Sequence, residues 1–202
     1  MKTILPGEQI SDKPVRMENG VIEDGKTYAT VIGLLDEASQ AFIPLETVWY
    51  PRRDDFVIGI VENSRNSVYN VNLSSPFRGL IIGRRGETSM NIGDVVSASI
   101  RDVQRESDQI INILWRERKL FGGKLIMVRP SKVPRIIGKQ NTMIKQLEAG
   151  TKSTILTGMN GMVWIKGGDI PLAIKAIKKI QDEAHVSGLT ERIAKMLNEE
   201  SK

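Results

Sequence analysis

Residues 124–165 read KLIMVRPSKVPRIIGKQNTMIKQLEAGTKSTILTGMNGMVWI, and the order of elements in this block is the best clue to what the chain does. Its first five residues, 124–128, are mostly apolar and predict a strand. In residues 131–137 apolar side chains recur three and four positions apart, which predicts one face of a short helix. Residues 138–141, Gly-Lys-Gln-Asn, interrupt that pattern. The block therefore opens with a strand, a helix and a glycine-containing loop.

A second helix follows the loop. Met143, Ile144 and Leu147 share an apolar helical face. Asn141 is the expected N-cap, since its side chain can accept a hydrogen bond from the first turn. Gly150 is expected to end this helix from a left-handed conformation. Two short helices therefore flank the Gly-Lys-Gln-Asn loop.

The next segment reads as a hairpin. Residues 153–157 and 162–165 are strand-like and enclose Gly-Met-Asn-Gly at positions 158–161. Asn160 followed by Gly161 is a tight-turn signal, because both residue types tolerate positive φ. A long helix is then expected to begin at a cap on Asp169 and to run to about position 184.

Strand, helix, loop, helix, strand, strand and helix is the type I order of a KH domain, and the text RIIGK at 135–139 strengthens this resemblance. In KH domains the loop is Gly-x-x-Gly and contacts nucleotide backbone. Here Asn141 replaces the second glycine. Two alternatives therefore stay open: the loop still contacts RNA, or the substitution has removed that contact. The resemblance implies RNA-binding candidates on and beside this loop: Arg135, Gly138, Lys139, Gln140, Asn141 and Lys145.

The positive charge is concentrated in the same C-terminal segment of the chain. Residues 119–202 carry fifteen basic and seven acidic side chains, residues 53–118 carry nine of each, and residues 1–52 carry five basic and eight acidic. This asymmetry favours a polyanionic partner, and solvated lysines are the alternative. We therefore predict three domains: 1–52, a small all-β module; 53–118, a barrel; and 119–202, an α+β KH domain.

Residues 53–118 predict a five-stranded OB barrel, because they hold five short strand-like runs. OB barrels bind single strands with aromatic platforms and basic side chains. Tyr69 and Phe77 are candidate platforms, with barrel core as the alternative for both. Arg65, Arg84 and Arg85 are candidate phosphate contacts, the last two lying in a glycine-bounded connector.

Several stretches across the whole chain resemble the RNA-binding cap subunit of the archaeal exosome. They are LPGE at 5–8, YPRRDDFVIGIVE at 50–62, SPFRGL at 75–80, IGDVVSASI at 92–100, and GMNG followed by MVWI at 158–165. In that family a β-rich N-terminal domain precedes an OB domain of ribosomal-protein-S-one type and a KH domain. The resemblance implies a structural motif at Gly158, Asn160, Gly161 and Trp164.

The same resemblance implies a non-catalytic function. Three such caps sit on a hexameric 3′-to-5′ exoribonuclease ring and feed single-stranded RNA into it. A free-standing RNA-binding regulator of translation or transcript stability is the alternative. Gel filtration of cell extract would separate the two, since only a cap co-elutes with a ring.

The residues that catalysis would need are sparse. The chain has no cysteine and one histidine, His185, expected near the end of a helix. Asp54 and Asp55 are adjacent, and neighbouring strand residues point to opposite faces, so the pair does not make a two-metal nuclease site. We expect no enzyme activity, no metal site and no cofactor. No stretch approaches the ~20 apolar residues of a membrane span, and a cytoplasmic location is expected.

Overall fold

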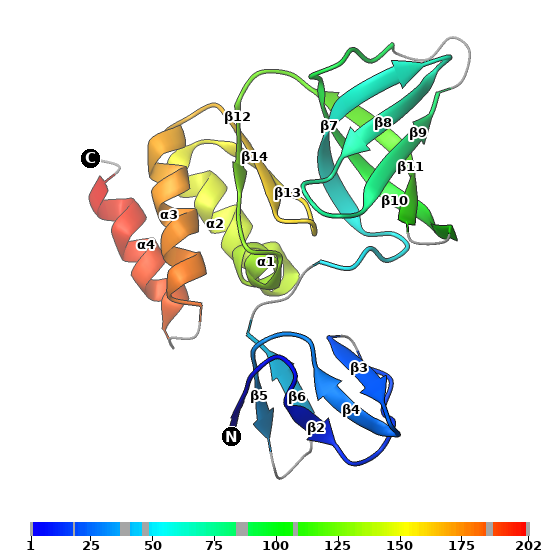
Figure 1. The fold of residues 1–202 in the computed structure, drawn as a ribbon. Coiled ribbons are helices and arrows are strands. Elements are labelled where there is room, and N and C mark those ends of the chain that lie inside the picture. Colours follow the sequence, from blue (N-terminus) through cyan, green and yellow to red (C-terminus); the bar gives the residue numbers. More distant parts are fainter. Residues whose placement is uncertain are drawn as a thin grey trace. The chain divides into compact units, whose positions relative to one another are not determined.

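The structure is a computed structural model that describes residues 2–17, 19–36, 41–45, 49–83, 89–106, 109–184 and 188–200 (Figure 1). The chain forms two compact units, residues 1–48 and 49–202. The second unit begins earlier than the expected boundary at position 53, because Trp49 packs in the barrel core. Among the described residues, no helix has the length and apolar character needed to cross a membrane.

The N-terminal unit consists of two three-stranded sheets with strand orders β1-β5-β6 and β2-β4-β3. The Asp24-Gly25 turn joins β3 to β4 with φ of 49° and 74°. Its small core includes Ile4, Ile10 and Ala29. The strands are β1 (Lys2–Ile4), β2 (Gln9–Ser11), β3 (Gly20–Glu23), β4 (Lys26–Ala29), β5 (Gly33–Asp36) and β6 (Ala41–Pro44).

The predicted five-stranded barrel is confirmed and is closed, in the order β10-β11-β9-β8-β7. Pairing of β10 with β7 closes it, and β9 pairs in parallel with β11. Val96, Ala98 and Ile100 alternate along β10 and all point into its core. The strands are β7 (Phe56–Arg65), β8 (Val68–Asn72), β9 (Arg78–Ile82), β10 (Val95–Glu106) and β11 (Gln109–Leu120).

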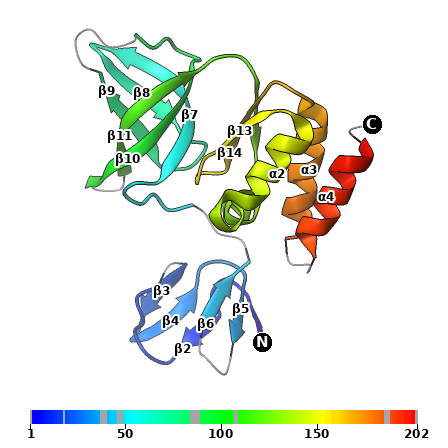
Figure 2. The same ribbon diagram turned by 180° about the vertical axis from the view of Figure 1, so that it is seen from behind.

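The α+β KH fold is also confirmed. A sheet in the order β12-β14-β13 lies between the helices and the barrel (Figures 1 and 2). Its strands are antiparallel, with Thr157 opposite Val163 beside the hairpin turn. The elements are β12 (Lys124–Met127), η1 (Pro130–Lys132), α1 (Val133–Ile137), η2 (Lys139–Asn141), α2 (Thr142–Thr151), β13 (Thr154–Thr157), β14 (Met162–Lys166), α3 (Ile170–Asp182) and α4 (Leu189–Glu200).

Three local expectations about the helices are tested by this unit. Asp169 caps α3, since its carboxylate accepts a hydrogen bond from the Leu172 N–H at 2.9 Å. Asn141 makes no such capping bond to α2, so that expectation was wrong. Gly150 does not end α2, because the helix continues to Thr151 and the left-handed residue is Lys152. The physical reason for glycine at 150 is close packing, since a Cβ there would lie 2.8 Å from Leu197 Cδ1.

The C-terminal helix α4 was not expected. The long helix predicted to reach position 184 ends at Asp182, and a second helix then packs on α2 and α3. Ile193, Met196 and Leu197 carry its apolar face into the KH core. A spacing of three to four residues was present in the sequence and could have identified this helix.

Candidate nucleic-acid interface

The Gly158–Gly161 turn attaches the KH unit to the barrel. Asn160 is 1% exposed, and its side-chain amide donates hydrogen bonds to the carbonyls of Ile58 at 2.7 Å and Leu73 at 2.8 Å. Its side-chain oxygen accepts a weaker bond from the Ile58 N–H at 3.3 Å. One buried side chain of the KH hairpin thereby pairs with backbone on two barrel segments.

The glycines of this turn allow that close approach. Gly161 has φ of +86°, and a Cβ there would lie 2.4 Å from the Val128 carbonyl oxygen. A Cβ at Gly158 would lie 2.9 Å from the Ile58 N–H nitrogen. Asn160 itself is not among the residues with positive φ, so its backbone does not explain its presence. The loop instead matches a three-residue hairpin that ends on a left-handed glycine.

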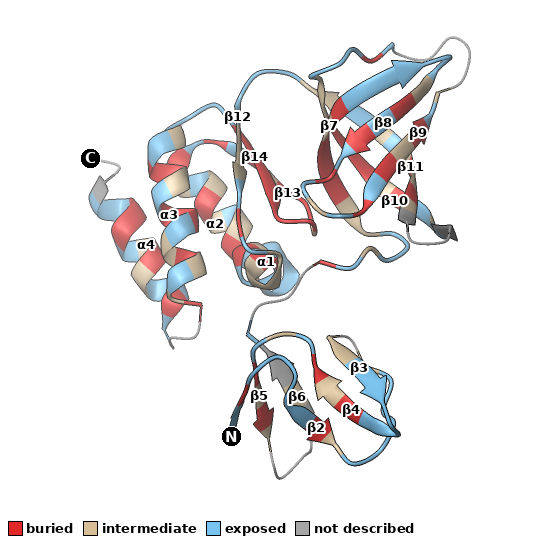
Figure 3. Cartoon of the chain, in the orientation of Figure 1, coloured by how far each residue is buried: buried red, intermediate tan, exposed pale blue. Residues whose placement is uncertain are grey.

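A separate apolar cluster fills the contact between barrel and KH sheet. Ile58 of the barrel and Met162 and Trp164 of β14 are buried together. The indole N–H of Trp164 donates to the Gly122 carbonyl at 2.8 Å. Strand β14 is buried on both faces, because Val163 and Ile165 point into the helical core (Figure 3). This explains its unbroken apolar sequence, which is typical of strands covered on both sides.

The KH loop keeps a compact shape without its second glycine. Gly138 has φ of +73°, and a Cβ there would lie 2.7 Å from the Met143 nitrogen. Gln140 and Asn141 both adopt left-handed conformations, with φ of 52° and 63°. Asparagine tolerates this region better than most residues, so Asn141 maintains the turn. The exposed Asn141 side chain is therefore left free of capping and lies at the loop surface.

Three basic side chains lie on the elements around this loop. Arg135 is on α1, Lys139 is in the loop and Lys145 is on α2, and all three are exposed. None of them makes an ion pair with a residue that the structure describes. The structure therefore brings these predicted residues to one end of the helical layer with their charges available to an anion.

The outer face of the barrel was not recognised from the sequence. Its strands β8, β9 and β11 run side by side, and their outward residues form three rows across the sheet. The rows consist of Asn72, Arg78 and Ile111; Asn70, Leu80 and Ile113; and, on β8 and β9 alone, Val68 and Ile82. OB folds bind oligonucleotides on the face of their second and third strands, which here are β8 and β9. The sequence signal for this face is the alternation within each strand, where every second residue is buried in the barrel and the residues between them point outward.

Trp115 and Arg116 give this face an aromatic edge. The Arg116 guanidinium lies 4.1 Å from the centre of the Trp115 ring, a cation–π contact. Arg116 has φ of +52°, beside an irregularity in the β10–β11 register. Such backbone strain is tolerated where the surrounding structure fixes it, and it turns the arginine over the ring.

The barrel residues chosen from the sequence have different placements. Tyr69 and Phe77 are 7% and 8% exposed and pack in the barrel core, which supports the alternative that both are core residues. Arg65 is exposed at the end of β7. Arg84 and Arg85 lie outside the described residues, so their predicted RNA contacts stay predictions.

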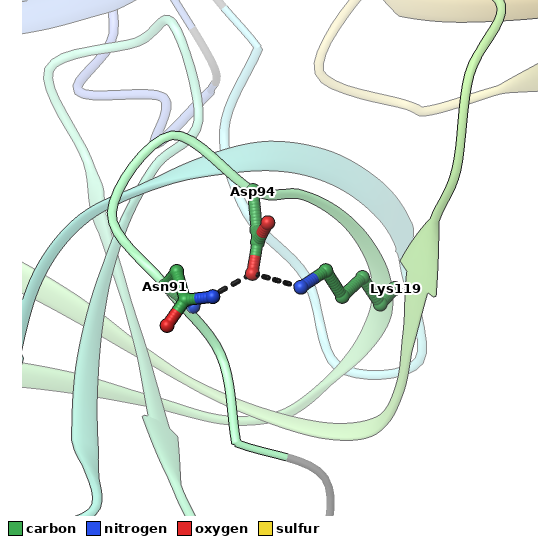
Figure 4. Close-up of polar contacts among 3 residues, drawn as sticks. All are labelled: Asn91, Asp94 and Lys119. Atoms are coloured by element: carbon green, nitrogen blue, oxygen red, sulfur yellow. Dashed lines mark hydrogen bonds and ion pairs between the residues drawn. The ribbon is translucent and has the colours of Figure 1, made fainter.

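Asp94 and Lys119 form an ion pair where β10 begins and β11 ends (Figure 4). One carboxylate oxygen of Asp94 accepts hydrogen bonds from the Lys119 ammonium at 2.5 Å and from the Asn91 backbone N–H at 2.6 Å. The bond from Lys119 and then the bond from Asn91 hold the pKa of Asp94 below its usual range. This pair occupies the end of the barrel where β10 begins and β11 ends.

The described residues contain no group of three acidic or histidine side chains that could hold a metal ion. The single histidine, His185, lies outside the described residues. Asp55 is engaged structurally, since its carboxylate accepts hydrogen bonds from the Trp49 indole at 3.1 Å and the Arg52 N–H at 3.0 Å.

Comparisons with known proteins agree with this architecture. The KH domain family matches residues 123–171. Over its full length the chain is 35% identical to exosome complex component Rrp4 of Methanosarcina barkeri, covering 84% of that protein. It is 32% identical to Rrp4 of Nitrosopumilus maritimus over 98% of this chain and 96% of the relative. A crystallised protein assigned as an exosome complex RNA-binding protein superposes on 76% of this chain with a TM-score of 0.65 and 26% identity.

Proposed function

The chain belongs to the family of exosome complex component Rrp4, and on that premise we propose that it is a non-catalytic RNA-binding subunit of an exosome. Three copies cap a six-subunit exoribonuclease ring in this proposal. Each copy holds single-stranded RNA and passes its 3′ end to the ring, which supplies the catalytic residues.

One observation carries the proposal: two nucleic-acid-binding folds form a single compact unit. The buried amide of Asn160 bonds to both Ile58 and Leu73, and the Trp164 cluster fills the contact beside it. RNA held by one fold is then at high effective concentration for the other fold, and for neighbouring copies. Weak, salt-sensitive contacts can thereby retain RNA while still allowing it to move.

The residues proposed to contact RNA lie on both folds. In the KH unit the backbone of the loop faces phosphate, and the three basic side chains around the loop add positive charge. In the barrel the outer face of β8 and β9 receives the strand. The proposed contacts are Arg65, Arg84, Arg85, Arg135, Gly138, Lys139, Gln140, Asn141 and Lys145, with Arg78 added from the barrel face. Tyr69 and Phe77 support this face from the core.

Binding is tested with the double variant Lys139→Ala/Lys145→Ala. A fluorescent single-stranded oligoadenylate is titrated at several salt concentrations. We expect weaker binding and a shallower salt dependence, with the slope reduced by roughly 0.7 for each phosphate that no longer has a lysine partner. The matched control is Lys178→Ala/Lys195→Ala, which removes the same charge from α3 and α4. Equal slopes for both doubles would contradict the loop assignment.

Function is tested by reconstitution with a nuclease ring. The chain alone should not shorten RNA, and added to the ring it should increase RNA binding and the length degraded per encounter. A variant with Asp54 and His185 replaced by alanine should leave the RNA-degrading activity of the capped ring intact, after its folding is checked by thermal unfolding. Degradation of RNA by the isolated chain would contradict the proposal. Failure to co-elute with the ring, with RNA binding intact, would favour the free-standing regulator.

A further inference from the structure

Three aromatic rings of the barrel unit contact one another in sequence, and the outermost of them belongs to Tyr50. Trp49 and Phe77 are buried in the barrel core, edge to face, with ring centres 6.2 Å apart. The Tyr50 ring lies 5.3 Å from that of Phe77 at an angle of 46°, yet Tyr50 is 45% exposed. One side of the Tyr50 ring is thus supported by the core while the residue stays accessible.

The segment that carries Tyr50 is held firmly to the barrel, although it follows directly on the N-terminal unit. Two backbone hydrogen bonds join it to β10: the Asp54 N–H donates to the Ile100 carbonyl at 2.8 Å, and the Ile100 N–H donates to the Asp55 carbonyl at 2.9 Å. The Asp55 carboxylate binds the Trp49 indole within the same segment. The backbone segment that carries Tyr50 is therefore held to the barrel before any ligand arrives, which lowers the entropic cost of binding.

Two arginines lie near this ring in the sequence or next to the residue that supports it. Arg53 is three residues away in the chain, and Arg78 directly follows Phe77 at the edge of the outer barrel face. Both guanidinium groups are exposed and form no ion pair with any residue in the described ranges. The Asp55 carboxylate is occupied by its two hydrogen bonds, and the exposed Asp54 is the nearest acidic neighbour in sequence.

We propose that Tyr50 is a stacking platform for one nucleobase of single-stranded RNA, with Arg53 and Arg78 contacting the adjoining phosphates. This inference rests on the proposed RNA-binding function and extends the outer barrel face beyond Arg78. An exposed aromatic ring beside arginines without acidic partners is the combination that single-strand-binding surfaces use, because every base has a face that can stack. Selection among bases is weak at such a platform, which suits a subunit that handles many RNAs.

The other strongly exposed aromatic ring among the described residues, Phe121, has a different setting. It is 63% exposed, and the Lys119 ammonium near its ring is already bound to Asp94. The Lys119 ammonium beside Phe121 is therefore already paired with the Asp94 carboxylate. Phe121 provides a matched control for removal of an exposed ring.

The test compares two ligands of equal length: an oligoadenylate and an abasic ribose-phosphate oligomer. Tyr50→Ala should bind the oligoadenylate about tenfold more weakly, as expected for the loss of one stacked base. Tyr50→Phe should stay within about twofold of the native chain, because its ring still stacks. The abasic oligomer should bind all three proteins equally. Phe121→Ala should match the native chain with both ligands.

Other outcomes would overturn the inference in distinguishable ways. If the native chain binds the oligoadenylate tightly and Tyr50→Ala binds it equally well, the Tyr50 platform is refuted while the RNA-binding function stands. An equal loss for the abasic oligomer, or an equal loss in Phe121→Ala, also overturns it. Absence of binding of either oligomer to the native chain overturns the RNA-binding function and this inference together. Thermal unfolding of each variant identifies a folding defect, and Tyr50→Phe, which keeps the packing on Phe77, decides the question if Tyr50→Ala is unstable.

Discussion

Replacing Asn160 with alanine should loosen the contact between the barrel and the KH unit. The change removes two short hydrogen bonds to the carbonyls of Ile58 and Leu73 and one longer bond from the Ile58 N–H. A buried hydrogen bond contributes about 1 kcal/mol net, and a buried group left without its partner costs about 1–3 kcal/mol. We therefore expect the free energy of unfolding to fall by about 2–4 kcal/mol.

Urea unfolding followed by circular dichroism and tryptophan fluorescence measures this change. Trp164 lies in the contact between the two folds, so its environment should change early in the transition. Asn160→Asp should be at least as damaging, because a carboxylate would face two carbonyl oxygens and become a buried charge. Asn198→Ala, an exposed position on α4, is the control and should change stability by less than about 0.5 kcal/mol.

The reasoning fails if Asn160→Ala unfolds at the native midpoint with the native slope. RNA affinity of the folded variant should stay close to native, because Asn160 is buried and cannot itself reach a ligand. Weaker RNA binding by a variant of full stability would move the turn from a structural role to a binding role.

Three further predictions concern stability. Gly161→Ala should destabilise the chain more than Gly93→Ala by about 1–3 kcal/mol in chemical unfolding, because both have strongly positive φ but only at Gly161 would the Cβ meet a carbonyl oxygen. The pKa of Asp94 is lowered in the folded chain, so its pair with Lys119 stabilises the fold fully at pH values above the usual carboxyl pKa. This stabilisation is lost as the pH falls through the lowered pKa. Asp94→Asn should thus be less stable than the native chain near neutral pH, with the difference shrinking in acid unfolding below about pH 4. Gly150→Ala should lower the melting temperature despite better helix propensity, because overpacking against α4 costs about 1–3 kcal/mol.

Much of the fold could be predicted from the sequence because its signals are local. The alternation in β10, the cap at Asp169 and the Asp24-Gly25 turn each depend on residues within a few positions of one another. The KH order followed from such elements in sequence. Helix α4 was missed although its apolar spacing was visible, and the end of α2 was misplaced because glycine was interpreted as a terminator.

The candidate site was less predictable, because it depends on exposure and on partners far along the chain. The sequence shows three aromatic residues in or beside predicted strands: Tyr50, Tyr69 and Phe77. Only the packing of the folded barrel decides that Tyr69 and Phe77 are buried while Tyr50 stays accessible. Local periodicity cannot say which ring a closed barrel buries. The basic residues around the KH loop could be proposed from the sequence because the loop has a recognisable pattern, and their RNA contacts stay predictions.

The sequence by itself determined the order of strands and helices, the turn at residues 158–161 and the excess of positive charge in residues 119–202. Only the tertiary structure decided what Asn160 does. Its partners, Ile58 and Leu73, lie 102 and 87 positions away, and no local pattern encodes a bond over that separation. The backbone of the turn requires only Gly161 to have positive φ, so the turn does not explain the asparagine. The barrel does: the buried carbonyls of Ile58 and Leu73 need a hydrogen-bond donor, and the Asn160 amide supplies it.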